Sequence, residues 1–467
     1  MSKATQLLSD QQMKAFIQNG YLKLTTDFPD QFHQQIHRQV EQMFDQYGNL
    51  GNNMLPLIPN IQQIFDHPVV HGALTGILGS NYVLHSHRYC HLNPPGSSGQ
   101  SFHKDSYEGD VSAIHHRCRW VLAFYYPQDT PETIGPTAIL PGTQYYDTSQ
   151  AAHRQPELAL SGQAGAVTLV HYDLWHRAMP NPSQRKRYML KFLFYRLDEP
   201  TTPSWNYQQA DWEAIDSENG QTKLDLVWHK LWDWYRGESS PDNGSTSVPL
   251  IGGEGGSKLS ALIKQLRTGE ESEQLDAAYA LGSQPAVSEL IDLLPDKSVG
   301  RYAAYALGAS DATAVPALTE ALADQDETVR ANAAYALGDI GRPAQVATHQ
   351  LAQALTDDSA PVRRNATEAL GTIGQTDGSI VPALASLLQD KQYWVRDNAA
   401  RTLAKMGAAA ESAVTALQCA LSDENRYVRF NAAMALKQIG TPTAHQVLFD
   451  NLFMSRWCSL TTRDSSF

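Results

Sequence analysis

The order of hydrophobic and polar positions changes once along this chain, near residue 240. Before that point, a few helical segments are followed by short apolar runs separated by Gly, Pro and Asn turns. The expected helices span 10–20, 31–47 and 60–78, and the first is opened by a capping box of Ser9 and Gln12. The expected strands span 21–24, 82–92, 101–105, 120–126, 137–140, 166–170 and 188–195. Many short strands between turns predict a β-sandwich or jelly roll.

A repeat dominates the chain after residue 258. Three features recur every 33 residues: a Val-Arg pair, an Asn two residues after the arginine, and an Asp five residues before the valine. The pairs are Val329-Arg330, Val362-Arg363, Val395-Arg396 and Val428-Arg429. A fixed period with an Ala- and Leu-rich second half predicts stacked helical pairs. We expect the recurrent Asp and Val-Arg positions to join neighbouring repeats, which is a structural role.

These patterns predict a multidomain chain. The expected parts are a sheet domain with flanking helices at 1–236, a flexible Gly/Ser/Pro linker at 237–257, an all-α solenoid at 258–450, and an unassigned tail at 451–467. The segment 224–235 has an amphipathic pattern, so we expect a helix that packs on the outside of the sheet domain.

Composition narrows the functions open to the protein. The formal net charge of −13 argues against binding to nucleic acid or to an anionic membrane surface. The four cysteines are far apart and form no C-x-x-C pair, so we expect reduced thiols in a cytoplasmic protein. No signal peptide and no membrane span are expected, because neither the N-terminus nor any other stretch is apolar for long enough.

Histidine-dependent chemistry belongs to the first half of the chain, since fourteen of the sixteen histidines lie at or before His229. His103 and Asp105 are two residues apart, so on a strand both would point to one face. His176 follows a buried strand and precedes a Pro-Asn-Pro turn, and Arg187 lies eleven residues later, on what we expect to be the neighbouring strand. Two imidazoles and one carboxylate can occupy one face of an octahedral Fe(II), and an arginine can clamp a carboxylate.

Three segments carry a resemblance to a known family. The sequences SFHKD (101–105), IGPTAILPGTQYY (134–146) and LWHRAMPNPSQRKRYMLKF (174–192) resemble the phytanoyl-CoA dioxygenase family over roughly residues 7 to 200. The resemblance implies a double-stranded β-helix with a metal between its sheets. It also implies that His103, Asp105 and His176 are catalytic Fe(II) ligands and that Arg187 binds the distal carboxylate of 2-oxoglutarate. The family's second segment usually ends Gly-Ser-His, whereas this chain has Gly142-Thr143-Gln144.

The reaction implied is hydroxylation of an organic substrate that the sequence does not identify. It would consume 2-oxoglutarate and O2, with oxidative decarboxylation coupled to attack on a C–H bond. Related halogenases replace the ligand carboxylate with a small residue, so Asp105 favours hydroxylation. Two observations leave simpler interpretations of these candidate site residues open. His171 and Asp173 form a second H-x-D triplet, and Arg187 alone would be one exposed member of the cluster 185–187.

The repeats resemble HEAT repeats of the kind found in phycobilin lyase subunits, over about 260–450. This resemblance implies a scaffold for a protein partner. Two other functions stay open at this point: a scaffold whose barrel has lost catalysis, and a phycobilin lyase-like activity. Catalysis by the repeats themselves, as in HEAT-repeat di-iron hydroxylases, is rejected because 258–450 lacks the paired His-Glu motifs.

Overall fold

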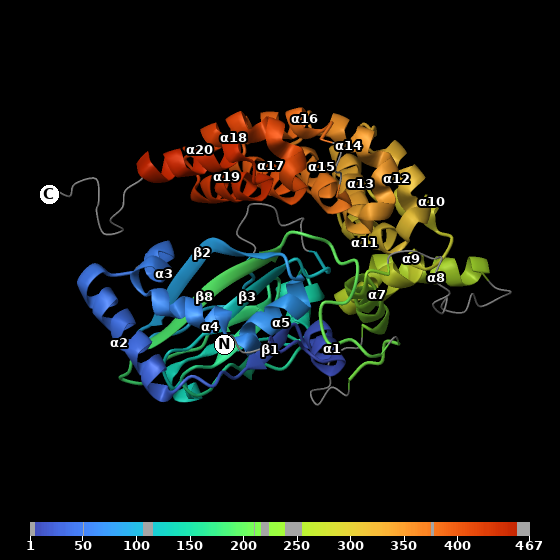
Figure 1. Ribbon diagram of the computed structural model, residues 1–467. Coiled ribbons are helices and arrows are strands. Elements are labelled where there is room, and N and C mark those ends of the chain that lie inside the picture. The colour runs from blue at the N-terminus through green and yellow to red at the C-terminus, as the bar shows by residue number, and fades with distance from the viewer. Residues whose placement is uncertain are drawn as a thin grey trace. The chain divides into compact units, whose positions relative to one another are not determined.

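The computed structural model describes residues 5–49, 51–105, 115–209, 211–215, 224–238, 255–374 and 378–454 (Figure 1). These residues form two compact units. The first runs from residue 5 to 215 and is built on β-sheets, and the second runs from 224 to 454 and is helical. The predicted combination of a sheet domain with an all-α solenoid is therefore confirmed.

Helix α1 (Asp10–Asn19) begins at the predicted capping box. The Gln12 N–H donates to Ser9 Oγ (3.3 Å), and the Ser9 N–H donates to Gln12 Oε1 (3.0 Å). The helix ends at Gly20, whose φ of +74° favours glycine. A Cβ at Gly20 would also lie only 2.4 Å from Gln144 Oε1, so no larger residue fits here. Both ends of this helix follow from the sequence.

The other described elements of the first unit include five further α-helices and eight strands. The helices are α2 (Asp30–Tyr47), α3 (Met54–Leu57), α4 (Gln62–Asp66), α5 (Pro68–Leu78) and α6 (Ser149–Ala152). The strands are β1 (Tyr21–Leu24), β2 (Tyr82–Asn93), β3 (Trp120–Tyr125), β4 (Thr137–Ile139), β5 (Leu158–Ala159), β6 (Val167–His171), β7 (His176–Ala178) and β8 (Arg187–Arg196).

Two antiparallel sheets make up the predicted jelly roll. The larger has the order β1-β6-β3-β8-β2, and the smaller has the order β5-β4-β7. Buried side chains from both sheets and from the segments beside them meet in one hydrophobic cluster: Leu122, Phe124, Tyr126, Ile139, Leu160, Val170, Leu174, Met189 and Leu193. This cluster is the core between the sheets.

Helices α2, α4 and α5 lie along the outer face of the larger sheet (Figure 1). Phe65 of α4 packs edge-on against Phe192 and Phe194 of β8, at ring-centroid distances of 4.6 and 5.2 Å. Because side chains alternate along a strand, the positions between them, including Arg187 and Lys191, face the interior of the jelly roll. The side chains of Arg187 and Lys191 are thus directed inward.

Two expected features near the site differ from the structure. Residues 101–105 do not form a strand, and only His103 pairs with the smaller sheet, through an isolated antiparallel bridge to His176. The expectation that His176 and Arg187 lie on neighbouring strands is wrong, since β7 belongs to the smaller sheet and β8 to the larger one. The connection crosses between sheets and is held by Asn181, whose side-chain amide donates to Asn93 O (3.0 Å) and Arg185 O (2.8 Å).

The second unit is a run of short helices stacked in pairs. These are α7 (Asp225–Arg236), α8 (Gly255–Thr268), α9 (Glu271–Gly282), α10 (Val287–Ile291), α11 (Gly300–Ala309), α12 (Val315–Ala321), α13 (Glu327–Ile340), α14 (Thr348–Ala354), α15 (Ala360–Ile373), α16 (Val381–Ser386), α17 (Tyr393–Met406), α18 (Val414–Ala420), α19 (Arg426–Ile439) and α20 (Pro442–Met454).

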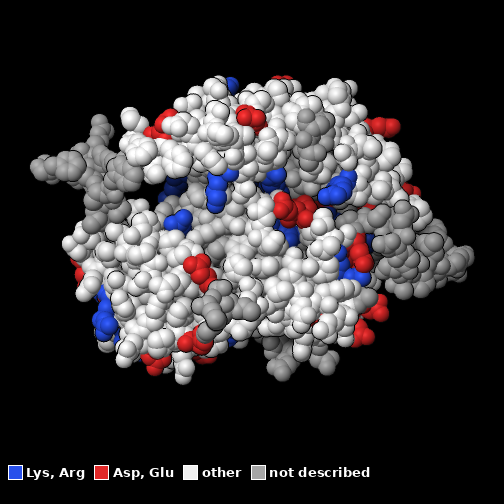
Figure 2. Space-filling model, viewed as in Figure 1, with Lys and Arg blue, Asp and Glu red and all other residues white. Residues whose placement is uncertain are grey.

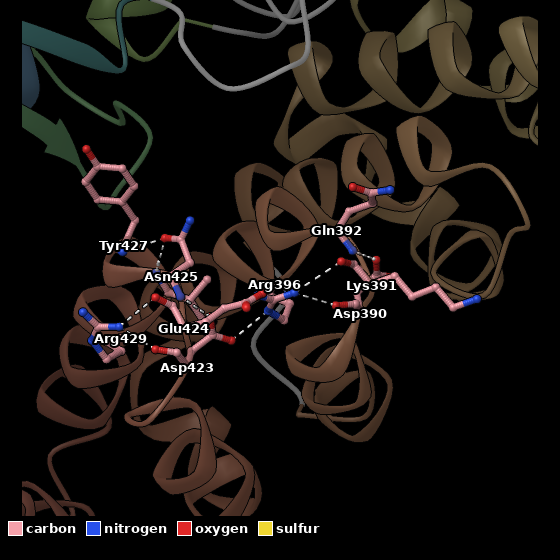
Figure 3. Close-up of polar contacts among 10 residues, drawn as sticks. Asp390, Lys391, Gln392, Arg396, Asp423, Glu424, Asn425, Tyr427 and Arg429 are labelled. Carbon is pink, nitrogen blue, oxygen red and sulfur yellow. Dashed lines mark hydrogen bonds and ion pairs between the residues drawn. The ribbon is translucent and has the colours of Figure 1, made fainter.

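The recurrent arginines join one repeat to the next, as predicted. Arg363 donates from Nε and Nη2 to the Asp390 carboxylate (2.7 and 3.1 Å), and from Nη1 to Asp357 O in its own repeat (2.8 Å). The same pattern links Arg330 to Asp357 and Arg396 to Asp423, the latter drawn in Figure 3. Each aspartate also accepts from a backbone N–H two residues later, which fixes the turn before the following helix; the Gln392 N–H to Asp390 is one instance (2.8 Å).

Helix α7 differs in placement from the sequence-based expectation. It belongs to the helical unit, where it packs against α9, and Lys230 pairs with Asp311 at 3.2 Å. Its buried side chains include Trp228, Leu231 and Trp232. The amphipathic pattern predicted the helix correctly, but such a pattern carries no information about which apolar surface covers it.

The described part of the chain contains no helix with the length and apolarity needed to cross a bilayer. On the face drawn in Figure 2, Lys and Arg side chains occur in small groups separated by uncharged and acidic residues.

Candidate metal centre

His103 and His176 are brought together by backbone pairing. The His103 N–H donates to His176 O (2.9 Å), and the His176 N–H donates to His103 O (3.0 Å). This two-bond bridge sets the imidazole rings side by side, with centroids 4.6 Å apart. Asp105 lies two residues beyond His103, and one ligand atom from each of the three side chains lies within 4.8 Å of the other two. Three residues that are distant in the sequence thus converge on one point.

Hydrogen bonds to the ring nitrogens orient both imidazoles. Nδ1 of His103 lies 3.0 Å from Ser101 O, and Nδ1 of His176 lies 2.9 Å from Leu174 O. A carbonyl oxygen can only accept, so we assign the proton to Nδ1 in each ring and the lone pair to Nε2. This tautomer, with a carbonyl behind the ring, is the usual arrangement of a metal-ligating histidine.

Burial keeps His176 neutral. Desolvation is the main cause that lowers its pKa; the nearby Asp105 carboxylate opposes the shift, and His103 adds to it. A neutral imidazole is the form that binds a metal ion, so this environment suits a ligand. The donor set of two imidazoles and one carboxylate fits Fe(II) with open positions for a co-substrate.

Asp105 is fully buried and has contacts from both sheets. Its carboxylate Oδ2 lies 3.7 Å from His176 Nε2 on the smaller sheet and accepts a hydrogen bond from Lys191 Nζ on the larger sheet at 2.6 Å. Its backbone oxygen accepts from the Tyr172 hydroxyl (2.7 Å). The site therefore lies between the two sheets, as the family resemblance implied.

Arg187 is a buried cation on the same inner face. Only 1% of it is exposed, and its Nε donates to Gly135 O (2.8 Å) while Nη1 donates to His91 O (3.4 Å). Its described partners are neutral carbonyls, and no carboxylate of the described residues pairs with it. By contrast, the adjacent Lys186 is exposed and pairs with Asp45. The predicted split, with Arg187 inward and Lys186 outward, is confirmed.

Gly135 holds Arg187 in place. Its carbonyl accepts from both Arg187 and the Asn93 amide (2.9 Å), and its φ is +68°. A Cβ at this position would lie 2.6 Å from Asn93 Nδ2 and from Pro180 O. A glycine is therefore required for close backbone approach, which explains its place in the segment 134–146.

Two further residues near the site, Lys191 and His91, were not predicted from the sequence. Lys191 is 2% exposed and contacts Asp105. His91 is half-buried, and its buried Nε2 atom has no hydrogen-bond partner within the described residues. Burial chiefly, with Lys191 next, lowers the pKa of His91 to about 3. Strand alternation from Arg187 would have placed Lys191 on the same face. His91 required the β2–β8 register, in which it pairs with Met189.

Among the described residues, the second H-x-D triplet forms no such cluster. His171 ends β6, and its Nδ1 accepts the Asp173 N–H at 3.1 Å. Burial is the main cause that lowers the pKa of His171 to about 3 and raises that of Asp173 to about 6. This pair closes the turn after β6. Gln144, where the family usually has histidine, also has a structural role. Its side-chain amide donates to Ile17 O (2.9 Å), which joins the turn at 143–145 to helix α1.

Comparisons with known proteins agree with this architecture. Residues 5–189 match the family model of phytanoyl-CoA dioxygenase (PhyH), and residues 287–349 and 348–418 match that of HEAT repeats. No curated protein matches the chain.

Among solved structures, the chain is similar to the non-heme alpha ketoglutarate dependent carbocyclase SnoK from nogalamycin biosynthesis, with 15% identity, 41% of this chain and 85% of SnoK covered, and a TM-score of 0.36. It is also similar to EctD from S. alaskensis with bound Fe, with 16% identity, 41% and 77% covered, and a TM-score of 0.36. The family models give the assignment: the chain carries a phytanoyl-CoA dioxygenase (PhyH) domain, followed by HEAT repeats.

Proposed function

We propose that the sheet unit is a non-haem Fe(II)- and 2-oxoglutarate-dependent oxygenase that hydroxylates a small organic molecule. One observation carries the proposal. Three convergent ligand atoms occur between the two sheets together with a buried arginine that no carboxylate of the described residues pairs with. A buried cation needs an anionic partner, and a diacid that also binds a metal supplies that partner while reaching the ligand cluster.

In this proposal His103, Asp105 and His176 hold the iron through two Nε2 atoms and one carboxylate oxygen. When bound, Fe(II) with 2-oxoglutarate and O2 supplies an oxidant for a C–H bond, releasing succinate and carbon dioxide. The protein contributes orientation. The carbonyls of Ser101 and Leu174 keep both rings in the metal-binding tautomer, and the backbone bridge keeps the ring positions fixed.

Arg187 would bind the distal carboxylate of 2-oxoglutarate. A guanidinium is suited to this role because it forms two parallel hydrogen bonds and stays charged when buried. Its Nε is already committed to Gly135 O, so the fork is anchored before the ligand arrives. The Nε2 atom of His91 has no hydrogen-bond partner in the part of the chain that the structure describes, and the backbone oxygen of His91 contacts Arg187. This Nε2 is a further group that the ligand could satisfy.

Asp105 supports hydroxylation as the outcome. A carboxylate occupies the ligand position that related halogenases leave to chloride, so this site favours oxygen insertion. The substrate is an organic molecule of unidentified class. The HEAT repeats support a second part of the proposal, in which the helical unit recruits a protein partner to the oxygenase.

The experiment is anaerobic addition of Fe(II) and then 2-oxoglutarate to the purified full chain. We expect one Fe(II) per chain and a weak visible charge-transfer band that appears only with both components. His176→Ala should abolish the band, because it removes a ligand without touching Arg187. Absence of the band in the parent protein, despite stoichiometric iron, would contradict the proposal.

A further inference from the structure

A buried lysine contacts the proposed metal-binding carboxylate directly. Lys191 is 2% exposed and lies on β8, and its Nζ is 2.6 Å from Asp105 Oδ2. Oδ2 is also the carboxylate oxygen that lies 3.7 Å from His176 Nε2. The ammonium group therefore contacts the oxygen that faces the histidine ligand, so it lies where it would compete with a metal cation.

The charge on Asp105 explains why a cation is needed there. Asp105 is 0% exposed, and a buried carboxylate without a counter-charge is costly. The nearest other group of the cluster, His176 Nε2, lies 3.7 Å from Asp105 Oδ2, whereas the Lys191 ammonium lies 2.6 Å from it. Lys191 is the cation that the described contacts place on Asp105.

Binding of a divalent metal changes this balance. A metal ion bonded to Asp105 would lie close to the ammonium of Lys191, and two like charges in a buried site repel strongly. The two cations would thus stabilise the same carboxylate one at a time. A lysine has four flexible side-chain bonds, so its ammonium can withdraw from Oδ2 when a metal arrives.

We infer that Lys191 acts as a positioning residue that substitutes for the metal: it keeps the empty site folded and lowers the site's affinity for divalent cations. This inference rests on the proposed metal site, and it concerns the metal-free protein rather than the oxidation reaction. Lys191 would make the empty protein stable at the expense of metal affinity.

The test compares Lys191→Met with the parent in titrations with Co(II), in the absence of 2-oxoglutarate, together with thermal unfolding of both forms. Methionine is also unbranched and nearly as long as lysine, and it carries no charge. We expect Co(II) to bind Lys191→Met about ten- to a hundredfold more tightly, since one nearby like charge is removed. The melting temperature of the metal-free variant should fall, and saturating Co(II) should restore it to that of the loaded parent.

Two further variants separate charge from shape. Lys191→Arg keeps the charge and should retain low Co(II) affinity. Lys191→Gln keeps a hydrogen-bond donor without charge and should behave like Lys191→Met; it also serves if the methionine variant does not fold without metal. Weaker or equal Co(II) binding by both neutral variants would overturn the inference, as would equal loss of melting temperature in the empty and loaded forms. A parent protein that binds no Co(II) would instead contradict the proposed metal site.

Discussion

Arg187 and Lys191 project from the same face of β8, four residues apart, but within the described residues only Lys191 has a carboxylate partner. Both side chains are almost fully buried. One strand thus carries two interior cations with different surroundings: Lys191 pairs with a protein carboxylate, and we propose that Arg187 binds the carboxylate of a ligand.

Arg187→Met should weaken binding of 2-oxoglutarate to the iron-loaded protein by about 2–5 kcal/mol, which is roughly thirty- to several-thousand-fold in affinity. The reason is loss of a charge-assisted contact, with the ligand's carboxylate left buried and unpaired. Iron binding should persist, because Arg187 is not in the ligand cluster. The measurement is a titration of the charge-transfer band. Lys186→Met is the matched control, since Lys186 is exposed and should change little; equal affinities for the two variants would remove Arg187 from the site.

The two H-x-D triplets can be separated by mutation. His176→Ala should reduce Co(II) affinity by orders of magnitude because it removes one of three ligands, whereas His171→Ala should retain binding. His171 is expected to affect stability instead, since its Nδ1 accepts the Asp173 N–H in the turn after β6. Isothermal titration and thermal unfolding of both variants give the two readouts. Loss of metal in His171→Ala with retention in His176→Ala would reverse our assignment.

Much of this architecture is readable from sequence because it depends on local or periodic signals. The capping box of Ser9 and the left-handed Gly20 are local, and the arginine–aspartate contacts between repeats follow from a fixed period. The crossing between sheets after His176 is different, since Asn181 holds it through contacts with Asn93, 88 residues away. Such long-range contacts produce no local or periodic pattern in the sequence. The contact between Lys191 and Asp105 could not be predicted for the same reason, because the two residues are 86 positions apart in the sequence.

The placement of α7 changes where the chain should be cut. A fragment of residues 1–221 should fold, remain monomeric and bind Co(II), because it ends before α7. Extending it to residue 238 adds α7 without α9, which exposes apolar side chains such as Trp232 and should promote aggregation. Size-exclusion chromatography and Co(II) titration distinguish the fragments. A longer fragment that behaves better than the shorter one would mean that α7 completes the sheet domain, as its sequence first suggested.

The arginine contacts between repeats should be important for the stability of the helical unit. Arg363→Ala removes a bidentate pair with Asp390 and a bond to Asp357 O, and we expect a loss of about 1–3 kcal/mol in unfolding free energy. Arg429 is the control, because it occupies the same position in the last repeat but donates only to the carbonyls of Asp423 and Glu424 within the described residues (Figure 3). Arg429→Ala should cost clearly less. Thermal or urea unfolding followed by circular dichroism compares them, and equal losses would mean that the aspartate contact contributes nothing.

The central claim is that this chain couples decarboxylation of 2-oxoglutarate to oxygen chemistry at His103, Asp105 and His176. Its most direct test is succinate production by the purified full chain with Fe(II), 2-oxoglutarate and O2, compared with an anaerobic reaction and with His176→Ala. Because some turnover without the primary substrate is expected of such a site, no substrate has to be identified first. We predict slow succinate release that requires both Fe(II) and O2 and is lost in His176→Ala. Iron-loaded protein that releases no succinate in air, even with a broad mixture of candidate substrates, would contradict the account.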